Sequence, residues 1–347
     1  MPSIAVAGHL CIDLAPRLGD AIAMVPGTLT DVGELTLTLG GSVANTGTAL
    51  ANLGAEVHAH ARVGDDRLGG LLTSLLGDTG IDTTHIEAHG GTSTSYSLVL
   101  EQPGVDRAFW HHTGANALFD GASLATSTVD LLHVGYPALL PALVADGASP
   151  LRSLLHGARQ RGATTSVDLS VVDPRSPMGA VDWRRTLETL APSIDLLSPS
   201  LDDLTSALQI DEGFSIALVD RLSQWLVDAG VGIVAISAGA SGLFVRTADA
   251  SRFHGASSGM RGLADSWADR SLHQPALTVE NPVTTNGAGD ASSAGLAFAV
   301  AGSATLEEAL LLASTCSAAL ISGRRPTPDV LLGLSPDLST VLDGTFA

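Results

Sequence analysis

Short apolar runs, each followed by a helical pattern, recur along the chain, and this alternation constrains the fold more than any other feature. The runs are DLLHVG (130–135), TTSVDLS (164–170), DLLSPS (195–200) and VGIVAIS (231–237). Strands that alternate with helices form a mostly parallel sheet with helices on both faces. Ligands of such sheets bind outside the carboxyl ends of the strands. We therefore predict an α/β fold with its functional site at that edge.

Two further segments alternate apolar and polar residues, which is typical of exposed or half-buried strands. The first ends in ELTLTL and lies within residues 14–39, a stretch that proline and glycine interrupt. The second lies within residues 93–115 and predicts a hairpin around Pro103-Gly104. Together they predict a small separate sheet, formed by two inserts into one large domain that covers residues 1–347.

The basic residues of the chain are all arginine, seventeen in number, and no lysine is present. This composition excludes the Walker A phosphate loop, the lysine of the protein-kinase fold and pyridoxal Schiff bases. The thirty-six acidic residues give a net charge of −19, which disfavours binding to nucleic acid or to an anionic membrane. A phosphate site in this chain must therefore use backbone amides, arginine or a metal ion.

Signals for export and for membrane insertion are missing from the sequence. The N-terminal residues lack a basic segment before their apolar run, and no uncharged apolar stretch reaches the ~18 residues that a spanning helix needs. The two cysteines, Cys11 and Cys316, are too few for a disulfide framework. We expect a soluble cytoplasmic protein.

The segment TTNGAGD (284–290) lies between a strand-like run and a helical run of small residues. Glycines at such a junction let a ligand approach the backbone, and the first amides of a helix have no partner within the helix. The amides of Gly287, Ala288 and Gly289 are therefore candidates for an anion site. Asp290, which the helix dipole is expected to keep ionised, is a candidate acceptor for the proton of an attacking hydroxyl. The alternative is an Asn-Gly turn followed by an aspartate that caps the helix.

A second candidate site lies near the N-terminus. Gly40-Gly41 precede a predicted helix, with Asn45 in its first turn, and Asp13 follows the first apolar run. A small residue at 41 lets a polyol lie against the backbone, while Asn45 offers a donor and an acceptor. Asp13, expected at the carboxyl end of the first strand, would hold sugar hydroxyls. The alternatives are a glycine turn, an ordinary helix residue and a loop aspartate.

Taken in order, Asp13, Gly40-Gly41, Asn45, RVGDD and GAGD resemble the motifs of the ribokinase-like (PfkB) family of sugar and nucleoside kinases. The resemblance implies a central mostly parallel sheet with helices on both faces and a small β-sheet lid. It also implies transfer of the ATP γ-phosphate to a hydroxyl group, with Asp290 as general base. The anion hole would be formed by the amides of residues 287–289, and the sugar would contact Asp13, Gly40, Gly41 and Asn45.

Weaker matches extend this resemblance to the nucleotide and the metal. AISAGASGLFV (235–245) resembles the strand–turn–strand unit beside ATP, which points to Ser237, Gly239 and Gly242, although a plain hairpin turn is the alternative. Ser200 and Asp203 occupy positions near the magnesium–phosphate region, where Asp203 would act on Mg²⁺ through water or would be an exposed helix acid. The segment HHTGANALF (111–119) resembles the return from the lid, which would bring Asn116 near the substrate.

The family often has an aspartate where this chain has Thr284, and that acid is associated with a monovalent-cation site in some members. The sequence therefore gives no support for a potassium site.

Three functions stay open from the sequence. The first is an ATP- and Mg²⁺-dependent sugar kinase whose partners are ATP and a small-molecule substrate. The second is a nucleoside kinase of the same fold, with Tyr96, Phe109 or Trp110 stacked on a base. The third is a ligand-binding member without catalysis, which would have no need of a proton acceptor at Asp290. A lid of short exposed strands also favours a homodimer through the lid.

Overall fold

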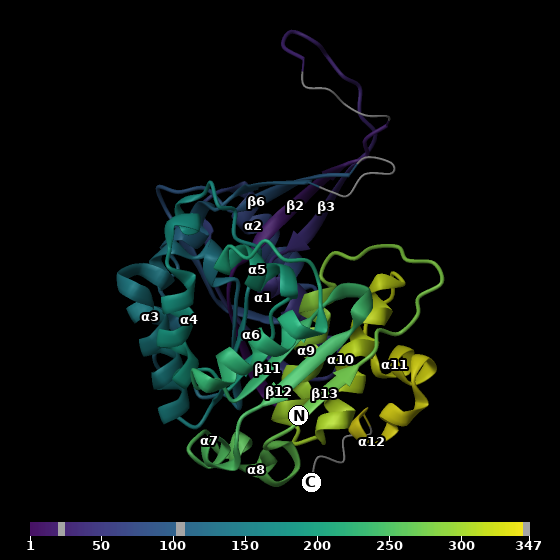
Figure 1. Cartoon of the computed structure of the whole chain (residues 1–347). Helices are drawn as coiled ribbons and strands as arrows, with labels where there is room; N and C mark the ends of the chain where they lie inside the picture. Colours follow the sequence, from purple (N-terminus) through teal and green to yellow (C-terminus); the bar gives the residue numbers. More distant parts are fainter. Residues whose placement is uncertain (20–24, 102–107, 343–347) are drawn as a thin grey trace.

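A nine-stranded sheet forms the centre of the molecule in the computed structural model, which describes residues 1–19, 25–101 and 108–342 (Figure 1). The strand order is β13-β12-β11-β10-β9-β8-β1-β4-β5, and β12 runs antiparallel to the other strands. The strands are β1 (Ser3–Gly8), β4 (Glu56–Gly64), β5 (Asp82–His89), β8 (Leu131–Gly135), β9 (Thr164–Asp168), β10 (Leu196–Leu197), β11 (Ile233–Ser237), β12 (Leu243–Thr247) and β13 (Ser271–Gln274). The predicted mostly parallel sheet is confirmed.

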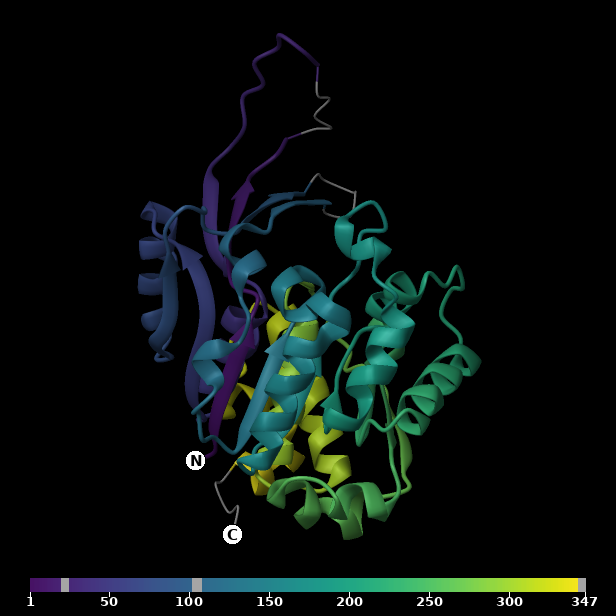
Figure 2. The same ribbon diagram turned by 90° about the vertical axis from the view of Figure 1, so that its left-hand side faces the viewer.

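Helices cover both faces of this sheet, as Figure 2 shows from the side. Along β1, Ile4 and Val6 belong to the apolar core on one face, while Ala5 and Ala7 belong to the core on the other. The first core packs against α1 (Ser42–Asn52), α2 (Arg67–Gly77), α7 (Ala250–His254), α8 (Ser258–Trp267), α9 (Ala288–Ala301), α10 (Leu306–Ile321), α11 (Pro328–Leu334) and α12 (Ser339–Leu342). The second packs against α3 (Pro141–Gln160), α4 (Trp183–Leu190), α5 (Leu201–Leu208) and α6 (Ile216–Asp228). The continuous apolar runs of the sequence therefore reflect strands that are buried on both faces.

A separate four-stranded sheet lies above the carboxyl ends of the main strands (Figures 1 and 2). Its strands, in the order β3-β2-β6-β7, are β2 (Cys11–Pro16), β3 (Leu35–Gly40), β6 (Tyr96–Leu100) and β7 (Ala108–His112). We call this sheet the lid. The predicted hairpin is present as the antiparallel pair β6–β7, and its turn at Pro103-Gly104 lies outside the described residues.

The position predicted for Asp13 is wrong. The chain leaves β1 at Gly8 and enters the lid at once, so Asp13 lies within β2 and not at the carboxyl end of the first strand. Short-range patterns did not separate the two strands, because the apolar run continues through Leu10 and Ile12, which are both fully buried. Asp13 thus belongs to the lid.

Helix α9 is built from small residues because it is buried on all sides. Its residues from Asp290 to Val300 are buried, and a β-carbon at Gly295 would lie 2.8 Å from the Cα of Ala313 in α10. Glycine at position 295 therefore allows the two helices to pack closely. Packing against α10 fixes the position of α9, whose N-terminus lies on the lid side of the sheet.

The strand order reverses at β1, which lies between β8 and β4. Such a reversal opens a crevice at the carboxyl ends of the neighbouring strands. The residues that follow these ends are His9 after β1 and Tyr136 after β8, and Asp168 ends the adjacent strand β9. In the described part of the chain, no helix combines the length and apolarity needed to cross a membrane.

Candidate active site

The carboxylate of Asp290 is held by side chains from three distant parts of the chain. Its Oδ2 accepts hydrogen bonds from Asn45 Nδ2 at 3.0 Å and from the Tyr136 hydroxyl at 2.7 Å, and its Oδ1 accepts one from Thr46 Oγ1 at 3.0 Å. Asn45 and Thr46 lie in α1, and Tyr136 follows β8. These bonds replace the predicted alternative of a helix-capping aspartate. Because a carboxylate offers about four acceptor positions, one is left for an incoming hydroxyl.

Burial opposes the effect that the helix dipole is expected to have on Asp290. The side chain is only 2% exposed, and burial raises the pKa of Asp290, while the bonds from Tyr136, Asn45 and Thr46 oppose that rise. Asp13 in the lid adds a further, electrostatic increase in this pKa. A raised pKa makes the carboxylate a better proton acceptor than a surface aspartate.

The three residues before Asp290 lie at the exposed end of α9. Gly287 is the N-cap residue with φ 77°, a conformation that favours glycine. The Ala288 amide donates to the Thr285 carbonyl at 3.3 Å. The amides of Gly287 and Gly289 donate to no acceptor in the described part of the chain. At the anion site predicted over 287–289, two amides therefore have no partner among the described residues, whereas the Ala288 amide is engaged by the turn.

Gly40 and Gly41 make room for side chains of the site. A β-carbon at Gly40 would lie 2.5 Å from Asp13 Oδ1, and one at Gly41 would lie 2.6 Å from Nδ1 of His9. His9 was not singled out in the sequence, although its place directly after an apolar run ending in glycine was a usable signal. The glycine pair is thus explained first by the close approach of Asp13 and His9 to the backbone.

Asn116 is brought to the site but has other partners. Its Nδ2 donates to the Leu10 carbonyl at 3.0 Å, and its Oδ1 accepts from the Leu10 amide at 3.3 Å. The side chain is fully buried in the 3-10 helix η1 (Gly114–Leu118). This geometry favours a structural role, in which Asn116 pins the crossing from β1 to the lid, over the predicted contact with substrate.

A chain of buried hydrogen bonds that the sequence did not indicate extends behind Asp290. Thr46 Oγ1 lies 3.3 Å from Ser42 Oγ, which in turn lies 3.2 Å from His133 Nε2. The other ring nitrogen of His133 lies 2.9 Å from Ser166 Oγ. Burial lowers the pKa of His133 to about 4, so the imidazole is neutral at pH 7. These groups fix the rotamer of Thr46 and through it the carboxylate.

Two further acids, Asp168 and Asp203, lie near Asp290. Burial raises the pKa of Asp168 well above its usual range, and Asp290 and Asp203 add to this rise. Burial also raises the pKa of Asp203 to about 6. Asp203 forms a capping box with Ser200, in which its Oδ2 accepts from the Ser200 amide at 2.8 Å and its own amide donates to Ser200 Oγ at 3.0 Å. The predicted exposed helix acid is therefore a buried cap with one oxygen unused by that motif.

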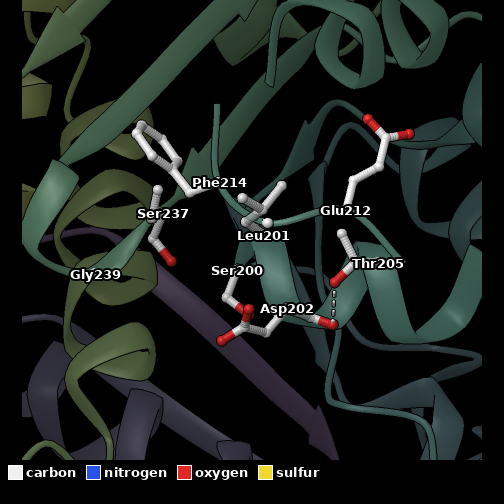
Figure 3. Close-up of a pocket in the computed structure, with 10 residues that line it drawn as sticks. Ser200, Leu201, Asp202, Thr205, Glu212, Phe214, Ser237 and Gly239 are labelled. Atoms are coloured by element: carbon white, nitrogen blue, oxygen red, sulfur yellow. Dashed lines mark hydrogen bonds between the residues drawn. The ribbon is translucent and has the colours of Figure 1, made fainter. Parts of the chain in front are cut away.

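A pocket of about 210 Å³ lies beside these residues (Figure 3). It is lined by Ser200, Leu201, Asp202, Thr205, Glu212, Gly213, Phe214, Ser237, Ala238 and Gly239. Ligand sites usually enclose ~300–1,000 Å³, so this pocket fits one part of a nucleotide and not the whole molecule. Gly242 is not among the lining residues, and a β-carbon there would lie 2.2 Å from the Gln274 carbonyl. Of the positions predicted beside ATP, Ser200, Ser237 and Gly239 meet in one pocket, while Gly242 is explained by packing against β13.

Comparison with known proteins shows which family the chain resembles. The sequence model described as pfkB family carbohydrate kinase matches residues 1–330. The chain belongs to this family. The PfkB-family chain is 26% identical over 349 residues to aminoimidazole riboside kinase of Salmonella typhimurium, in a match that covers 95% of this chain and 94% of that protein. It is 24% identical over 217 residues to fructokinase-2 of Solanum lycopersicum, a match that covers 61% of this chain and 64%, just under two thirds, of that relative.

Solved structures of the family share the architecture of the PfkB-family chain. A ribokinase from Arabidopsis thaliana, complexed with ribose and ATP, has a TM-score of 0.73 at 17% identity, covering 96% of this chain and 98% of that chain. A nucleoside kinase from Methanocaldococcus jannaschii has a TM-score of 0.70 at 15% identity, in a match that covers 97% of this chain and 99% of that chain. At these identities the likeness establishes the fold, and the predicted ribokinase-like fold is confirmed.

Proposed function

We propose that this PfkB-family chain transfers the γ-phosphoryl group of ATP to a hydroxyl of a small sugar or sugar-like acceptor. The observation that carries the proposal is the environment of Asp290, whose carboxylate has three donors, a raised pKa and one remaining acceptor position. It lies in the first turn of α9, directly after Gly287 and Gly289, whose amides have no acceptor among the described residues. A proton acceptor beside an anion site is what phosphoryl transfer to an alcohol needs.

In the proposed reaction the acceptor oxygen forms a bond to the γ-phosphorus while the bond from that phosphorus to the bridging oxygen of ADP breaks. The hydroxyl proton moves to Asp290. Charge that develops on the phosphoryl oxygens is stabilised by the amides of Gly287 and Gly289, and one well-placed donor of this kind is worth ~3–4 kcal/mol. Asn45 and Tyr136, both half-buried, are the donors to Asp290 on its accessible side.

A magnesium ion is implied by the family, and the nearby acids fit one. When bound, it would neutralise phosphate charge. In the described residues no arginine or histidine pairs with Asp168, Asp203 or Asp290, so these acids repel one another. Across residues 1–19, 25–101 and 108–342, no group of three or more His, Cys, Asp or Glu side chains converges to hold a metal ion by itself. We infer that Asp203 and Asp168 would hold the ion together with phosphate oxygens and water, which is the usual pattern for magnesium.

A nucleoside acceptor is the second candidate, and Phe109 favours it. Along a strand, alternate side chains point to opposite faces. Phe109 therefore shares the lid face of His111, whose Nδ1 lies 3.1 Å from Ser97 Oγ, whereas Trp110 points to the other face. Tyr96 also lies on that other face, where its ring contacts His112 at 5.3 Å. Of the three aromatics predicted to stack on a base, Phe109 therefore supports the nucleoside alternative, whereas Trp110 and Tyr96 lie on the other face.

A phosphorylation assay with ATP and a panel of D-fructose, D-ribose and aminoimidazole riboside tests the proposal. We expect acceptor-dependent formation of ADP and of a phosphorylated acceptor, both measured by mass spectrometry. A preference for the riboside over both sugars would select the nucleoside alternative. Ligand binding without any phosphorylated product across the panel would favour the non-catalytic alternative and contradict the proposed kinase.

We also propose that the lid forms a homodimer. The face of the lid that points away from Asp13 carries the exposed apolar side chains of Leu35, Leu37 and Trp110, which are 54%, 44% and 47% exposed. Exposed apolar surface of this kind marks interaction sites. A second copy of the chain would present the same face, which is the arrangement of a two-fold interface.

A cytoplasmic location is proposed from the cysteines. Cys11 and Cys316 are both buried and free. Free thiols persist in reducing compartments. Cell fractionation with an antibody to the chain would test this location.

A further inference from the structure

Three imidazole nitrogens near the proposed acceptor site are buried without a hydrogen-bond partner in the described structure. They are Nδ1 and Nε2 of His9 and Nε2 of His111. His9 is only 3% exposed. Buried polar side-chain atoms nearly always have a partner, so two histidines that lack one at the same place need an explanation. A ligand that supplies the partners is the explanation that fits a binding site.

The two rings lie between the lid acid and the proposed base. Their centroids are 5.0 Å apart, and the His9 ring is 5.7 Å from that of Tyr136, whose hydroxyl donates to Asp290. On the lid side, Ser97 Oγ lies 3.1 Å from His111 Nδ1 and 3.8 Å from the Cys11 thiol, which donates to Asp13. The rings therefore connect Asp13 to Asp290, one from the body of the protein and one from the lid.

The charge state of the rings restricts what they can bind. Burial lowers the pKa of His9 well below its usual range, with a further contribution from His111. Burial likewise lowers the pKa of His111 to about 4. A neutral imidazole carries one donor and one acceptor, which matches a hydroxyl group, whereas a carboxylate requires donors only. The carboxylate of Asp290 adds negative charge on the body side of the site, which disfavours an anionic acceptor.

We propose that His9 and His111 bind hydroxyl groups of the acceptor, and that the acceptor is an uncharged polyhydroxylated molecule and not a sugar acid. This inference rests on the proposed phosphoryl transfer, because it places the acceptor between Asp13 and Asp290. His111 lies on the lid, so its contact with the acceptor exists only when the lid is in place over the site. The glycine at 41, where a β-carbon would lie 2.6 Å from His9 Nδ1, is then required to keep the His9 ring in this position.

The test is equilibrium binding without ATP, by calorimetry, of D-fructose, D-ribose and 2-dehydro-3-deoxygluconate to the full chain and its variants. We expect the neutral sugars to bind and the sugar acid to bind at least tenfold more weakly. His111→Leu and His9→Leu should weaken binding of the neutral sugar at least tenfold, and His111→Gln should restore part of the loss because an amide keeps a donor and an acceptor. The matched control is His112→Leu, since His112 lies on the opposite face of the same strand and is exposed. The affinity of His112→Leu for the neutral sugar should stay within twofold of that of the wild type.

Thermal unfolding of each variant shows whether it is folded, and His111→Leu keeps the test valid if the buried His9→Leu fails to fold. Unchanged binding in His111→Leu, or tighter binding of the sugar acid than of both neutral sugars, would overturn the inference. The outcome differs from that of the kinase proposal. Phosphorylation of the sugar acid would reject this inference but support the proposed kinase activity. Histidine-dependent binding of a neutral sugar without phosphoryl transfer would support this inference but reject the kinase activity.

Discussion

At the scale of single residues, Tyr136 is the least expected member of the site. Its backbone has φ 64° and ψ 55°, a left-handed conformation that costs a bulky residue roughly 1–3 kcal/mol. The conformation directs the hydroxyl to Asp290 Oδ2 at 2.7 Å. Burial and the neighbouring Asp290 raise the pKa of Tyr136, so the hydroxyl stays protonated and acts as a donor. The strain is therefore located where it positions the proposed base.

Removing this hydroxyl should change the pH dependence of catalysis. The Tyr136 bond lowers the pKa of Asp290, so Tyr136→Phe raises that pKa further above its already raised value. A base works only when ionised, so activity is lost as pH falls through the pKa of Asp290. We expect the acid limb of the kcat profile to move to higher pH in Tyr136→Phe, with about a tenfold loss of kcat at pH 7. Tyr96→Phe, which alters the only other tyrosine of the chain, is the control. Superimposable profiles for both variants would contradict this role.

At the scale of elements, α9 begins with two glycines, Gly287 at the N-cap and Gly289 in the first turn. The two positions require glycine for different reasons. Gly287 has φ 77°, and its β-carbon would approach Asn45 at 3.6 Å. Gly289 lies within the helix, and a β-carbon there would meet nothing within 4 Å. The positive φ therefore explains Gly287, whereas neither backbone conformation nor packing explains Gly289, and an approaching ligand would.

This difference gives a paired prediction. Gly289→Ala should leave the free energy of unfolding unchanged or raise it by ~0.5–1 kcal/mol, because alanine favours helix, and should raise KM for ATP several-fold by crowding the phosphate. Gly287→Ala should lower the free energy of unfolding by about 1 kcal/mol or more because of its positive φ. Urea denaturation and steady-state kinetics measure the two effects. A normal KM for ATP in a stable Gly289→Ala would remove the anion site from 287–289.

The elements themselves follow well from the sequence, because each depends on local pattern. Strands β8, β9, β10 and β11 and helix α9 appear where apolar runs and glycine junctions predict them, and the lid appears where residues alternate, although its strand β2 was not separated from β1. What the sequence could not give is the partner of each polar side chain. Asn45 was found by its motif, but Tyr136 lies 154 residues from Asp290, and only the neighbouring ends of β1 and β8 bring it there. Asn116 shows the converse, since its motif predicts a contact with substrate, whereas the partner that the structure shows is the Leu10 backbone.

At the scale of the whole molecule, buried histidines make stability depend on pH. His133 is fully buried, and burial lowers its pKa from 6.5 to about 4. A group whose folded pKa lies below its unfolded pKa stabilises the fold above the unfolded value, and this contribution is lost as pH falls. The acids with raised pKa, such as Asp203, act in the opposite sense. The histidine contribution must therefore be isolated by a variant.

The comparison is between the wild type and His133→Asn across pH 7 to 4.5. We expect the advantage of the wild type in free energy of unfolding to shrink by roughly 2–3 kcal/mol over this range. Denaturant titrations at each pH give the two curves. A constant difference between them would show that His133 is not buried in the neutral state.

The oligomeric state tests the outer face of the lid. If the lid forms a homodimer, light scattering should give twice the chain mass of 35.2 kDa, and Leu37→Asp should give a monomer because the charge falls in the apolar contact. Leu71→Asp is the matched control, since Leu71 is also an exposed leucine but lies on α2. A monomeric wild type at micromolar concentration would reject the proposed dimer.

The central claim is that Asp290 accepts the hydroxyl proton, and the rate of phosphoryl transfer by Asp290→Asn tests it most directly. The variant keeps the shape of the side chain and should still bind ATP. We expect kcat to fall by ~10²–10⁴, the usual contribution of a general base, while Asp78→Asn on the exposed end of α2 retains the wild-type rate. An Asp290→Asn enzyme that is folded, binds ATP and turns over within a fewfold of the wild type would contradict the account.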